Sequence, residues 1–346
     1  MLPPVFGVLF DGIAYGMLLF VLSVGLSVTL GLMNFVNLAH CAFGMLGGYV
    51  SITLVNDFHW PFLATLPVAF LAAAIVSVVL ERTLYRRLYR STDLDQVLLT
   101  IGLAFISVSV AAYIFGTIQQ PVETPALLRG AVDFLGLGLG KYRLFLVGTA
   151  LVVTVLLVAG LEYTRFGAQV RAAVDNQRMA RGLGIDVDRT FAATFALGSG
   201  LAGLGGALAI EIVGLDPNFA FTYLVYVLII VSVGGLGSIA GSFAAAILIG
   251  VSDVAGKYYA PELGAFLIYL VMVVVLMWRP AGLFGRRWDG ARVLSKLRSF
   301  PRANIGSTRC WLYYVRKSAK ADLRWESRAQ ISALANGCPG SPLSRG

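Results

Sequence analysis

Few residues in this 346-residue chain have the types and spacing that catalysis requires. There is no H-E-x-x-H and no G-x-S-x-G motif, and the three cysteines (Cys41, Cys310 and Cys338) have no disulfide or metal-ligand spacing. A formal G-x-G-x-x-G occurs at 198–203, but without the preceding strand of a dinucleotide site, so close helix packing is the better interpretation. The stretch 250–258 imitates a phosphate loop with one residue too many between its glycines, and a tyrosine replaces the Ser or Thr. The sequence therefore predicts no enzyme and no nucleotide site.

The ionisable residues also argue against a carrier driven by an ion gradient. His40 and His59 are the only histidines, and a lone intramembrane histidine usually satisfies a packing hydrogen bond. Glu211 and Asp253 fall near the ends of expected spans, where water is predicted to reach them. A proton-driven carrier would instead need a buried acid with a partner in mid-span. A transporter without an ion relay must take its energy from another subunit.

The composition places these residues in an all-α membrane protein. Hydrophobic residues make up 58% of the chain and charged residues 13%, and long uncharged runs recur. The formal net charge of +9 belongs to the C-terminal end, because residues 1–278 carry 13 basic and 15 acidic side chains. The high charge therefore does not predict nucleic-acid binding. No basic region precedes the first apolar run, so we expect no secretory signal peptide.

The uncharged runs predict eight to nine transmembrane helices, some of them broken or re-entrant, within a permease domain at 1–285. Arginine-rich loops mark the cytoplasmic side, which predicts an outside N-terminus and a cytoplasmic C-terminus. The expected spans are 13–32, 42–55, 58–80, 97–116, 144–161, 190–210, the two halves of 217–252, and 263–278.

Two uncharged runs are interrupted by polar or glycine-rich stretches. Irregular backbone at membrane depth is tolerated only where protein or a water-filled cavity covers it. We therefore expect both stretches to line a translocation pathway, offering amides, an imidazole and freed backbone groups to a cargo. The alternative is that both are tight turns at the cytoplasmic surface. The residues concerned are Asn34, Asn37 and His40 in the first run, and Gly234, Gly235, Gly237 and Ser238 in the second.

The longest polar insertion between apolar runs is 164–189, which contains five arginines. Val170, Val174 and Met179 recur at helical spacing before two glycines end the pattern. This predicts a short amphipathic helix over Ala168–Arg181 that needs a surface to dock against. The alternative is an ordinary cytoplasmic loop that obeys the positive-inside rule.

Several of these stretches resemble one family. FGAQVRAAVDNQRMARGLGI and the following DRTFAATFALGSGLAGLGGAL are similar to the coupling loop and next span of ABC importer permeases, most closely the branched-chain amino-acid permeases. NFVNLAHCAFGMLGGYV, GGLGSIAGSFAAAILIG and the ending at 279–285 are similar as well, so the resemblance covers most of 1–285. Arg171 stands where the general importer motif has glutamate, Gln177 where it has glycine, and Cys41 follows the histidine where the family often has glycine.

The resemblance implies a function and a set of partners. The loop would contact an ATPase through Arg171, Ala172, Ala173, Met179 and Gly184. The complex would contain two ATP-binding subunits, a second homologous permease and an extracytoplasmic binding protein, in a bacterial inner membrane. This chain would need no cofactor, because the partner subunit uses ATP. The implied cargo is a branched-chain amino acid; urea or short amides are the alternative cargo, and a stand-alone secondary transporter is the alternative class.

The segment 286–346 differs from the rest of the chain, since it is basic, serine-rich and without a sustained apolar period. Such a composition cannot bury enough surface to offset its ordering entropy. We expect a dispensable, disordered cytoplasmic tail or an artefact of the reading frame. Binding to anionic lipid is the alternative.

Overall fold

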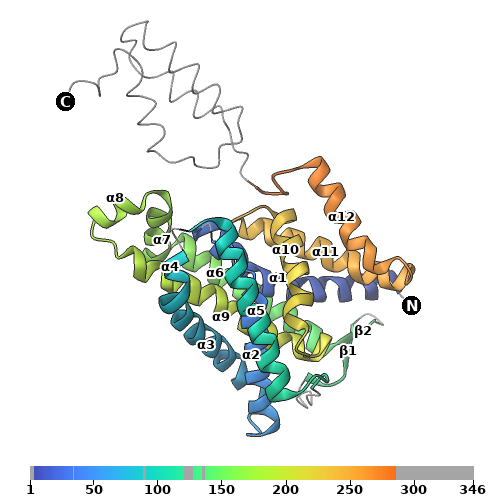
Figure 1. Ribbon diagram of the computed structural model, residues 1–346. Helices are drawn as coiled ribbons and strands as arrows, with labels where there is room; N and C mark the ends of the chain where they lie inside the picture. Colours follow the sequence, from blue (N-terminus) through green and yellow to red (C-terminus); the bar gives the residue numbers. More distant parts are fainter. Residues whose placement is uncertain (1–3, 34, 89–90, 121–127, 135–136, 286–346) are drawn as a thin grey trace, which may run out of the picture. The chain divides into compact units, whose positions relative to one another are not determined.

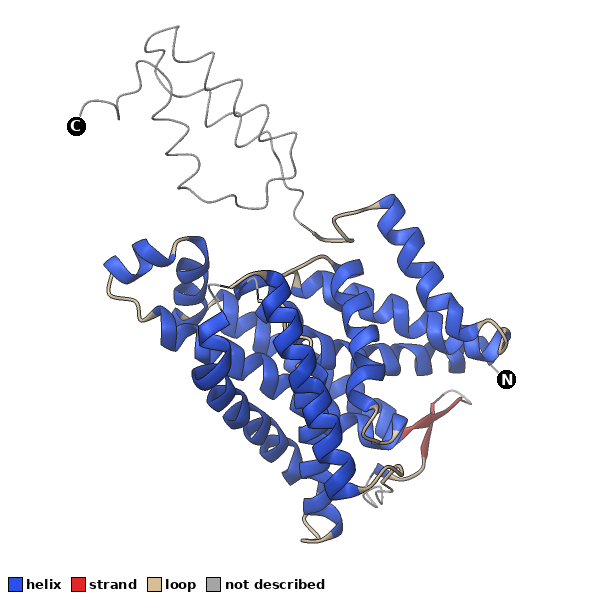
Figure 2. Ribbon diagram, viewed as in Figure 1, coloured by secondary structure: helices blue, strands red, loops and turns tan. Residues whose placement is uncertain are grey.

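The computed structural model describes residues 4–33, 35–88, 91–120, 128–134 and 137–285. These residues are almost entirely helical (Figures 1 and 2). One antiparallel hairpin, formed by β1 (Ala131–Phe134) and β2 (Leu137–Gly140), is the exception to the all-α prediction, and it lies in the loop between helices α5 (Asp93–Phe115) and α6 (Lys141–Glu162). The tail at 286–346, which the sequence predicts to be disordered, lies outside the described residues.

The elements follow one another in this order: α1 Pro4–Met33, α2 His40–Asn56, α3 Phe62–Leu80, the π-helical turn η1 Glu81–Tyr85, α4 Arg86–Leu88, α5 Asp93–Phe115, β1 Ala131–Phe134, β2 Leu137–Gly140, α6 Lys141–Glu162, α7 Arg165–Asp175, α8 Gln177–Gly182, α9 Val187–Val213, α10 Phe219–Gly234, α11 Ile239–Tyr259 and α12 Gly264–Trp278.

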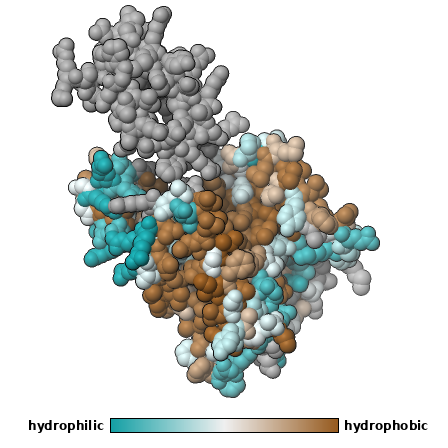
Figure 3. All heavy atoms as spheres, viewed as in Figure 1, coloured by the Kyte–Doolittle hydropathy of each residue, from teal (hydrophilic) through white to brown (hydrophobic). Residues whose placement is uncertain are grey.

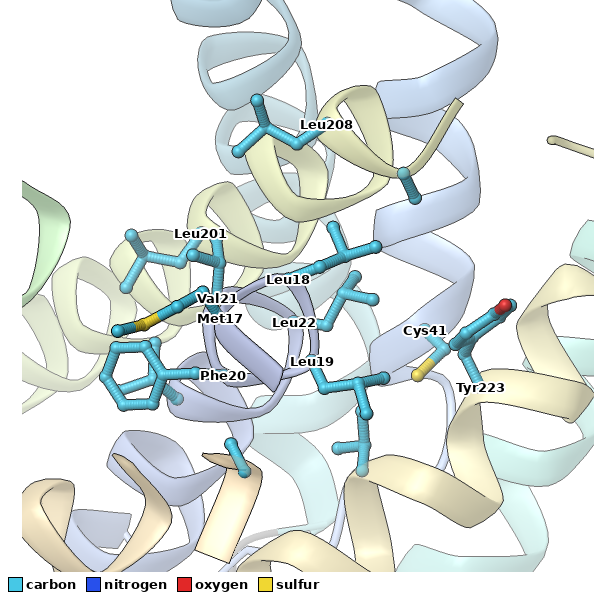
Figure 4. Packing of buried hydrophobic residues seen from close by; sticks show 14 of the residues in the cluster. Met17, Leu18, Leu19, Phe20, Val21, Leu22, Cys41, Leu201, Leu208 and Tyr223 are labelled. Atoms are coloured by element: carbon cyan, nitrogen blue, oxygen red, sulfur yellow. The ribbon is translucent and has the colours of Figure 1, made fainter. Parts of the chain in front are cut away.

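Helix α1 forms the centre of the packing. Its residues Leu18 to Leu22 are fully buried, five in a row, so no side of this segment faces lipid or water. Figure 4 shows these side chains pointing in several directions into the surrounding helices, with Cys41 and Leu201 among their neighbours. A helix that is apolar on every side is stable only when other elements surround it.

Glycines set the close approach of α1 to α11 and of α2 to α9. A Cβ added at Gly250 would lie 2.4 Å from the Cα of Gly16, and one added at Gly47 would lie 2.2 Å from the carbonyl oxygen of Gly203. The backbones of these helices therefore touch directly. Lipid tails are as apolar as leucine, so helices in a membrane associate through such close packing rather than through hydrophobic exclusion.

Burial separates an inner from an outer set of helices. The apolar windows of α1, α9 and α11 are 56%, 67% and 44% buried, whereas those of α5 and α6 are each only 17% buried. The exposed side chains of the outer helices are large and apolar, as at Phe105 and Val155. Figure 3 shows this brown surface over α3 and α5, between teal side chains at α7 and α8 and others near the opposite helix ends. Such a band is suited to lipid.

Six described helices are long and apolar enough to cross a membrane, and two shorter apolar helices, 219–234 and 266–278, accompany them. This agrees with the approximate expectation of eight to nine. The predicted glycine-interrupted span 42–55 is an unbroken helix, α2, despite its three glycines. The interruption lies before α2, where Phe35 to Ala39 form a non-helical segment with Phe35, Asn37 and Ala39 buried.

Candidate functional site

The polar loop 164–189 begins with a tight reversal of the chain after α6. The Thr164 hydroxyl caps α7 by accepting a hydrogen bond from the Gly167 amide at 3.3 Å. A Cβ at Gly167 would lie 1.9 Å from the Leu161 carbonyl oxygen, so only glycine allows α7 to fold back this closely on α6. The Arg171 guanidinium donates a hydrogen bond to the same Leu161 carbonyl oxygen and so ties α7 to the end of α6.

The predicted single helix over Ala168–Arg181 is wrong, because the loop contains two helices, α7 and α8. Asn176 separates them in an extended conformation, with φ −158° and ψ 97°. Its side-chain oxygen accepts hydrogen bonds from the amides of Arg178 and Met179, both at 3.1 Å, and so caps α8. Asparagine favours such caps over a helix interior, since its side chain competes for backbone amides.

A small apolar cluster anchors both helices to the rest of the protein. Ala173 of α7 and Ala180 of α8 are buried against Val187 and Phe191 at the start of α9, and Met33 at the end of α1 packs on the same cluster. The loop therefore has one fixed position at the Met33 end of α1. Of the predicted apolar stripe, only Val170 is buried, whereas Val174 and Met179 are 38% and 66% exposed.

The five residues predicted to contact an ATPase have different surroundings. Arg171 is exposed, Ala172 is half-buried, and Ala173 is fully buried within this chain. Met179 is 66% exposed. Gly184 has a φ of +83° in the turn between α8 and α9, with open space where a Cβ would be, so its role here is conformational.

The exposed side of α8 presents apolar side chains among arginines. Met179 is 66% exposed and Leu183 is 80% exposed, while Arg178 and Arg181 lie beside them. Leu183 was missed by the sequence argument, although its position four residues after Met179 would have placed it on the same helical face. Two large apolar side chains thus stand exposed within a loop that is otherwise polar.

Ion pairs join this loop to the arginine-rich segment after α3. Arg86 of α4 pairs with Asp188 at the start of α9, and Arg181 pairs with the other oxygen of Asp188 at 2.9 Å. All three side chains are about half exposed, so these pairs stabilise the fold only weakly. They do bring together the two segments that the sequence predicts to lie on the cytoplasmic side.

The first predicted pathway stretch lies in the interior. Asn37 is buried, its Oδ1 accepts from the Ala39 amide at 3.1 Å, and its Nδ2 has no partner among the described residues. The Nε2 of His40 lies 3.0 Å from the Leu22 carbonyl oxygen, and its Nδ1 is likewise without a described partner. Asn34, the third residue of this set, lies outside the described residues.

Two side chains of α5 satisfy the backbone of this stretch. The Gln96 side-chain oxygen accepts from the Val36 amide at 3.3 Å, and the Thr100 hydroxyl accepts from the Leu38 amide at 3.2 Å. Both side chains are buried. An unsatisfied amide at membrane depth costs several kcal/mol, so α5 makes the interruption possible. The sequence argument missed both residues, because nothing local links them to a segment some 60 residues earlier.

His40 lies deep in the helical bundle. A Cβ at Gly25 would be 2.1 Å from the Gly198 carbonyl oxygen and 2.9 Å from a ring carbon of His40. Gly198 is eleven residues along the 27-residue helix α9, about 16 Å from its start at a rise of about 1.5 Å per residue. The stretch therefore runs from the Met33 end of α1 toward the middle of the membrane.

The second stretch is a turn at the Met33 end of α1. Gly235 and Gly237 have φ values of +95° and +77°, and the Ser238 hydroxyl caps α11 by accepting from the Gly241 amide at 3.0 Å. Gly237 touches α1 at Gly31, six residues and about 9 Å along the axis from Gly25. The structure thus places the two stretches at different depths along α1.

The segment after α12 holds this second turn. The Leu283 amide donates to the Val233 carbonyl at 2.7 Å, and the Phe284 amide donates to the carbonyl of Gly234 at 3.1 Å. A Cβ at Gly235 would lie 2.5 Å from the Gly285 nitrogen. The glycine-rich turn is therefore a backbone junction between three segments.

Asp253 was expected near water at a span end, and the structure corrects this. Its side chain is 1% exposed, within α11, and pairs with Lys257 one turn later. Helices from elsewhere in the sequence cover it, which no local pattern reveals. Among the described residues, no group of three or more His, Cys, Asp or Glu side chains could hold a metal ion.

Comparison with known proteins gives a consistent result. The family model "Branched-chain amino acid transport system / permease component" matches residues 8–276. The chain is 25% identical over 297 residues to the high-affinity branched-chain amino acid transport system permease protein LivH of Salmonella typhimurium, covering 80% of this chain and 94% of LivH. It is 30% identical to a probable LivH permease of Methanocaldococcus jannaschii, covering 81% and 93%.

A second type of permease also matches. The high-affinity branched-chain amino acid transport system permease protein LivM of Salmonella typhimurium is 27% identical over 290 residues, covering 77% of this chain and 68% of LivM. No solved structure matches the chain. The helices, the lipid-suited surface and the family match over most of the sequence agree, and the chain belongs to the branched-chain amino acid transport permease family as a multi-pass membrane protein.

Proposed function

We propose that this chain is the membrane-spanning subunit of an ATP-driven importer that takes up branched-chain amino acids delivered by a binding protein. The loop of α7 and α8 carries the proposal, since it is fixed on α9 yet exposes Met179 and Leu183 to a partner. A separate pair of ATP-binding subunits would dock there and hydrolyse ATP. This chain would then need no cofactor of its own and would catalyse no reaction.

The relatives support a second permease in the same complex. This chain matches both a LivH and a LivM protein of Salmonella typhimurium, two permeases of one named transport system. We infer that this chain pairs with a related permease in a bacterial inner membrane. We infer from the arginine-rich segments at α4 and α8 that this end is cytoplasmic, which would put the N-terminus outside and residue 285 inside.

Transport by the purified complex tests the proposal. Proteoliposomes that contain both permeases and the ATP-binding subunits should accumulate leucine only with ATP and binding protein, because in the proposed complex the ATP-binding subunits supply the energy. Uptake by this permease alone would identify a secondary transporter. Accumulation of urea or acetamide in preference to leucine would assign a different cargo.

We further propose that the cargo passes the first interrupted stretch, where Asn37 and His40 keep unpartnered polar nitrogens deep in the protein. A pathway residue alternates between exposure to each side of the membrane as the transporter changes state. The turn from Gly234 to Ser238 would frame the exit of this pathway at the cytoplasmic end.

Single cysteines at these two stretches should differ in their accessibility. In a chain whose native cysteines are replaced, Asn37→Cys should react with an impermeant thiol reagent in one nucleotide state only, since Asn37 is buried in this structure. Ser238→Cys should react in every state, because Ser238 is half-exposed. Equal labelling of Asn37→Cys in all states, with normal uptake, would reduce the first stretch to a surface turn.

A further inference from the structure

A buried acid lies in α11 at the end of the bundle opposite the α7–α8 loop. Asp253 is 1% exposed, and its Oδ2 accepts a hydrogen bond from the Lys257 ammonium at 2.7 Å. Its other oxygen, Oδ1, is also buried and has no hydrogen-bond partner among the described residues. A half-satisfied carboxylate inside a membrane span is expensive and usually has a functional role.

Three tyrosines from two other helices surround this pair. Tyr15 belongs to α1, and its ring centroid lies 5.8 Å from the Lys257 nitrogen. Tyr223 and Tyr226 belong to α10, with ring centroids 5.7 Å apart. Both α10 tyrosines interact electrostatically with Asp253.

The cluster holds complementary groups and remains open on one side. Lys257 is 56% exposed although its carboxylate partner is buried, so the ammonium stands at the edge of the cluster. Tyrosine faces attract an ammonium group, and a carboxylate oxygen without a partner can accept a hydrogen bond from it. A lysine ammonium in turn pairs with a carboxylate.

This ion pair contrasts with the one formed by Asp11, the acid of α1. Asp11 pairs with Arg143 of α6, and both side chains are one third to one half exposed. That pair lies where water can solvate it, as is usual for ions at a span end. Asp253 has the opposite environment, so a structural role alone gives no reason for burying it.

We propose that Asp253, Lys257 and the tyrosines Tyr15, Tyr223 and Tyr226 bind the zwitterionic head group of an α-amino acid. The ammonium of the amino acid would bind the Asp253 carboxylate and the tyrosine rings, and its carboxylate would bind Lys257. This inference rests on the proposed function and narrows it, because neutral amides have no charges for this pair. Tyr15 is 18 residues, about 27 Å, from Met33 along α1, so the site lies where cargo would arrive from a binding protein.

Leucine uptake by the assembled transporter in proteoliposomes tests the site. The single variant Asp253→Asn would leave the Lys257 charge without its ion-pair partner. The main test is therefore the double variant Asp253→Asn with Lys257→Gln, which leaves no unpaired charge. Binding is expected to lose at least one charged hydrogen bond, which lowers uptake at subsaturating cargo about tenfold or more. Asp11→Asn is the matched control and should transport within about twofold of wild type.

The outcomes separate this inference from the proposed function. Absence of leucine uptake by the wild-type complex overturns the proposed function and this site with it. Normal wild-type uptake, with the double variant within about twofold of it, overturns the site alone and leaves the pair a structural one. Co-purification of the subunits and the melting temperature show whether the double variant is assembled.

A second measurement needs no variant. Without binding protein, millimolar L-leucine should raise the melting temperature of the wild-type complex, because a ligand that binds the folded state stabilises it. The neutral 4-methylpentanamide, which has the same apolar chain, should not. An equal effect of the two compounds would overturn the assignment of a zwitterion site.

Discussion

Replacing Gly206 by alanine is expected to lower the melting temperature of this permease by several degrees, or to prevent its accumulation in the membrane. A Cβ at this position would lie 1.8 Å from the carbonyl oxygen of Gly44, and 3.0 Å from the Gly44 Cα. These atoms belong to the backbone of α2, so no side chain can rotate away. Overpacking typically destabilises a protein by about 1–3 kcal/mol, and a rigid backbone puts this case at the upper end or beyond.

Gly102→Ala is the matched control for this prediction. Gly102 also lies inside a helix, α5, but no atom within 4 Å would meet its added Cβ. Alanine is favoured over glycine in a helix by up to about 1 kcal/mol, so the control should be neutral or slightly stabilised. Melting curves of the detergent-solubilised proteins compare the two. Equal stabilities would show that α2 and α9 do not pack through these glycines.

Changing Met179 and Leu183 together to aspartate should abolish ATP-driven leucine uptake while the permease itself stays folded. Both side chains are more than 60% exposed in the isolated chain, so the substitutions remove little internal packing. In a docked complex they would put two charges into an apolar contact, where single hot-spot changes already cost about 2 kcal/mol or more. We expect co-purification of the ATP-binding subunits and uptake to fall at least about thirtyfold together.

Ile118→Asp is the control for this second prediction, because Ile118 is 79% exposed and follows α5 at the end away from the loop. It should leave co-purification of the ATP-binding subunits intact. If the Met179 and Leu183 variant still carries its ATP-binding subunits and transports leucine normally, the ATPase contact lies elsewhere on this chain.

Local signals in the sequence predicted the breaks in the chain well. Gly235 and Gly237 adopt positive φ values, and Ser238 caps the next helix, so the residue types at 234–238 are themselves enough to predict a turn. The same kind of signal was overlooked at Asn176, whose capping side chain divides the loop helix in two. An asparagine three residues before Met179 was the available indication.

Depth and burial could not be predicted, because they depend on contacts between distant segments. Ala173 and Met179 are both apolar residues of one loop, yet only the position of α9 decides that Ala173 is buried and Met179 exposed. Asp253 directly follows the uncharged run that ends at residue 252, which suggested contact with water, but α11 continues to Tyr259. In the structure, α11 packs against α1, from far earlier in the chain, and against α10, which directly precedes it, and these helices enclose Asp253.

The central position of α1 has a consequence for how the protein is made. Its main neighbours, α9 and α11, begin about 150 and about 200 residues after α1 ends. At ribosomal rates of about 5–20 residues per second, α1 waits roughly 8–30 s for α9 and roughly 10–40 s for α11. Throughout that time Ser27 lacks Ser242, the hydroxyl that lies 2.9 Å from it in the finished protein. The first helix to be synthesised is thus among the last to gain all of its packing partners. Its folding therefore depends on the rate of translation.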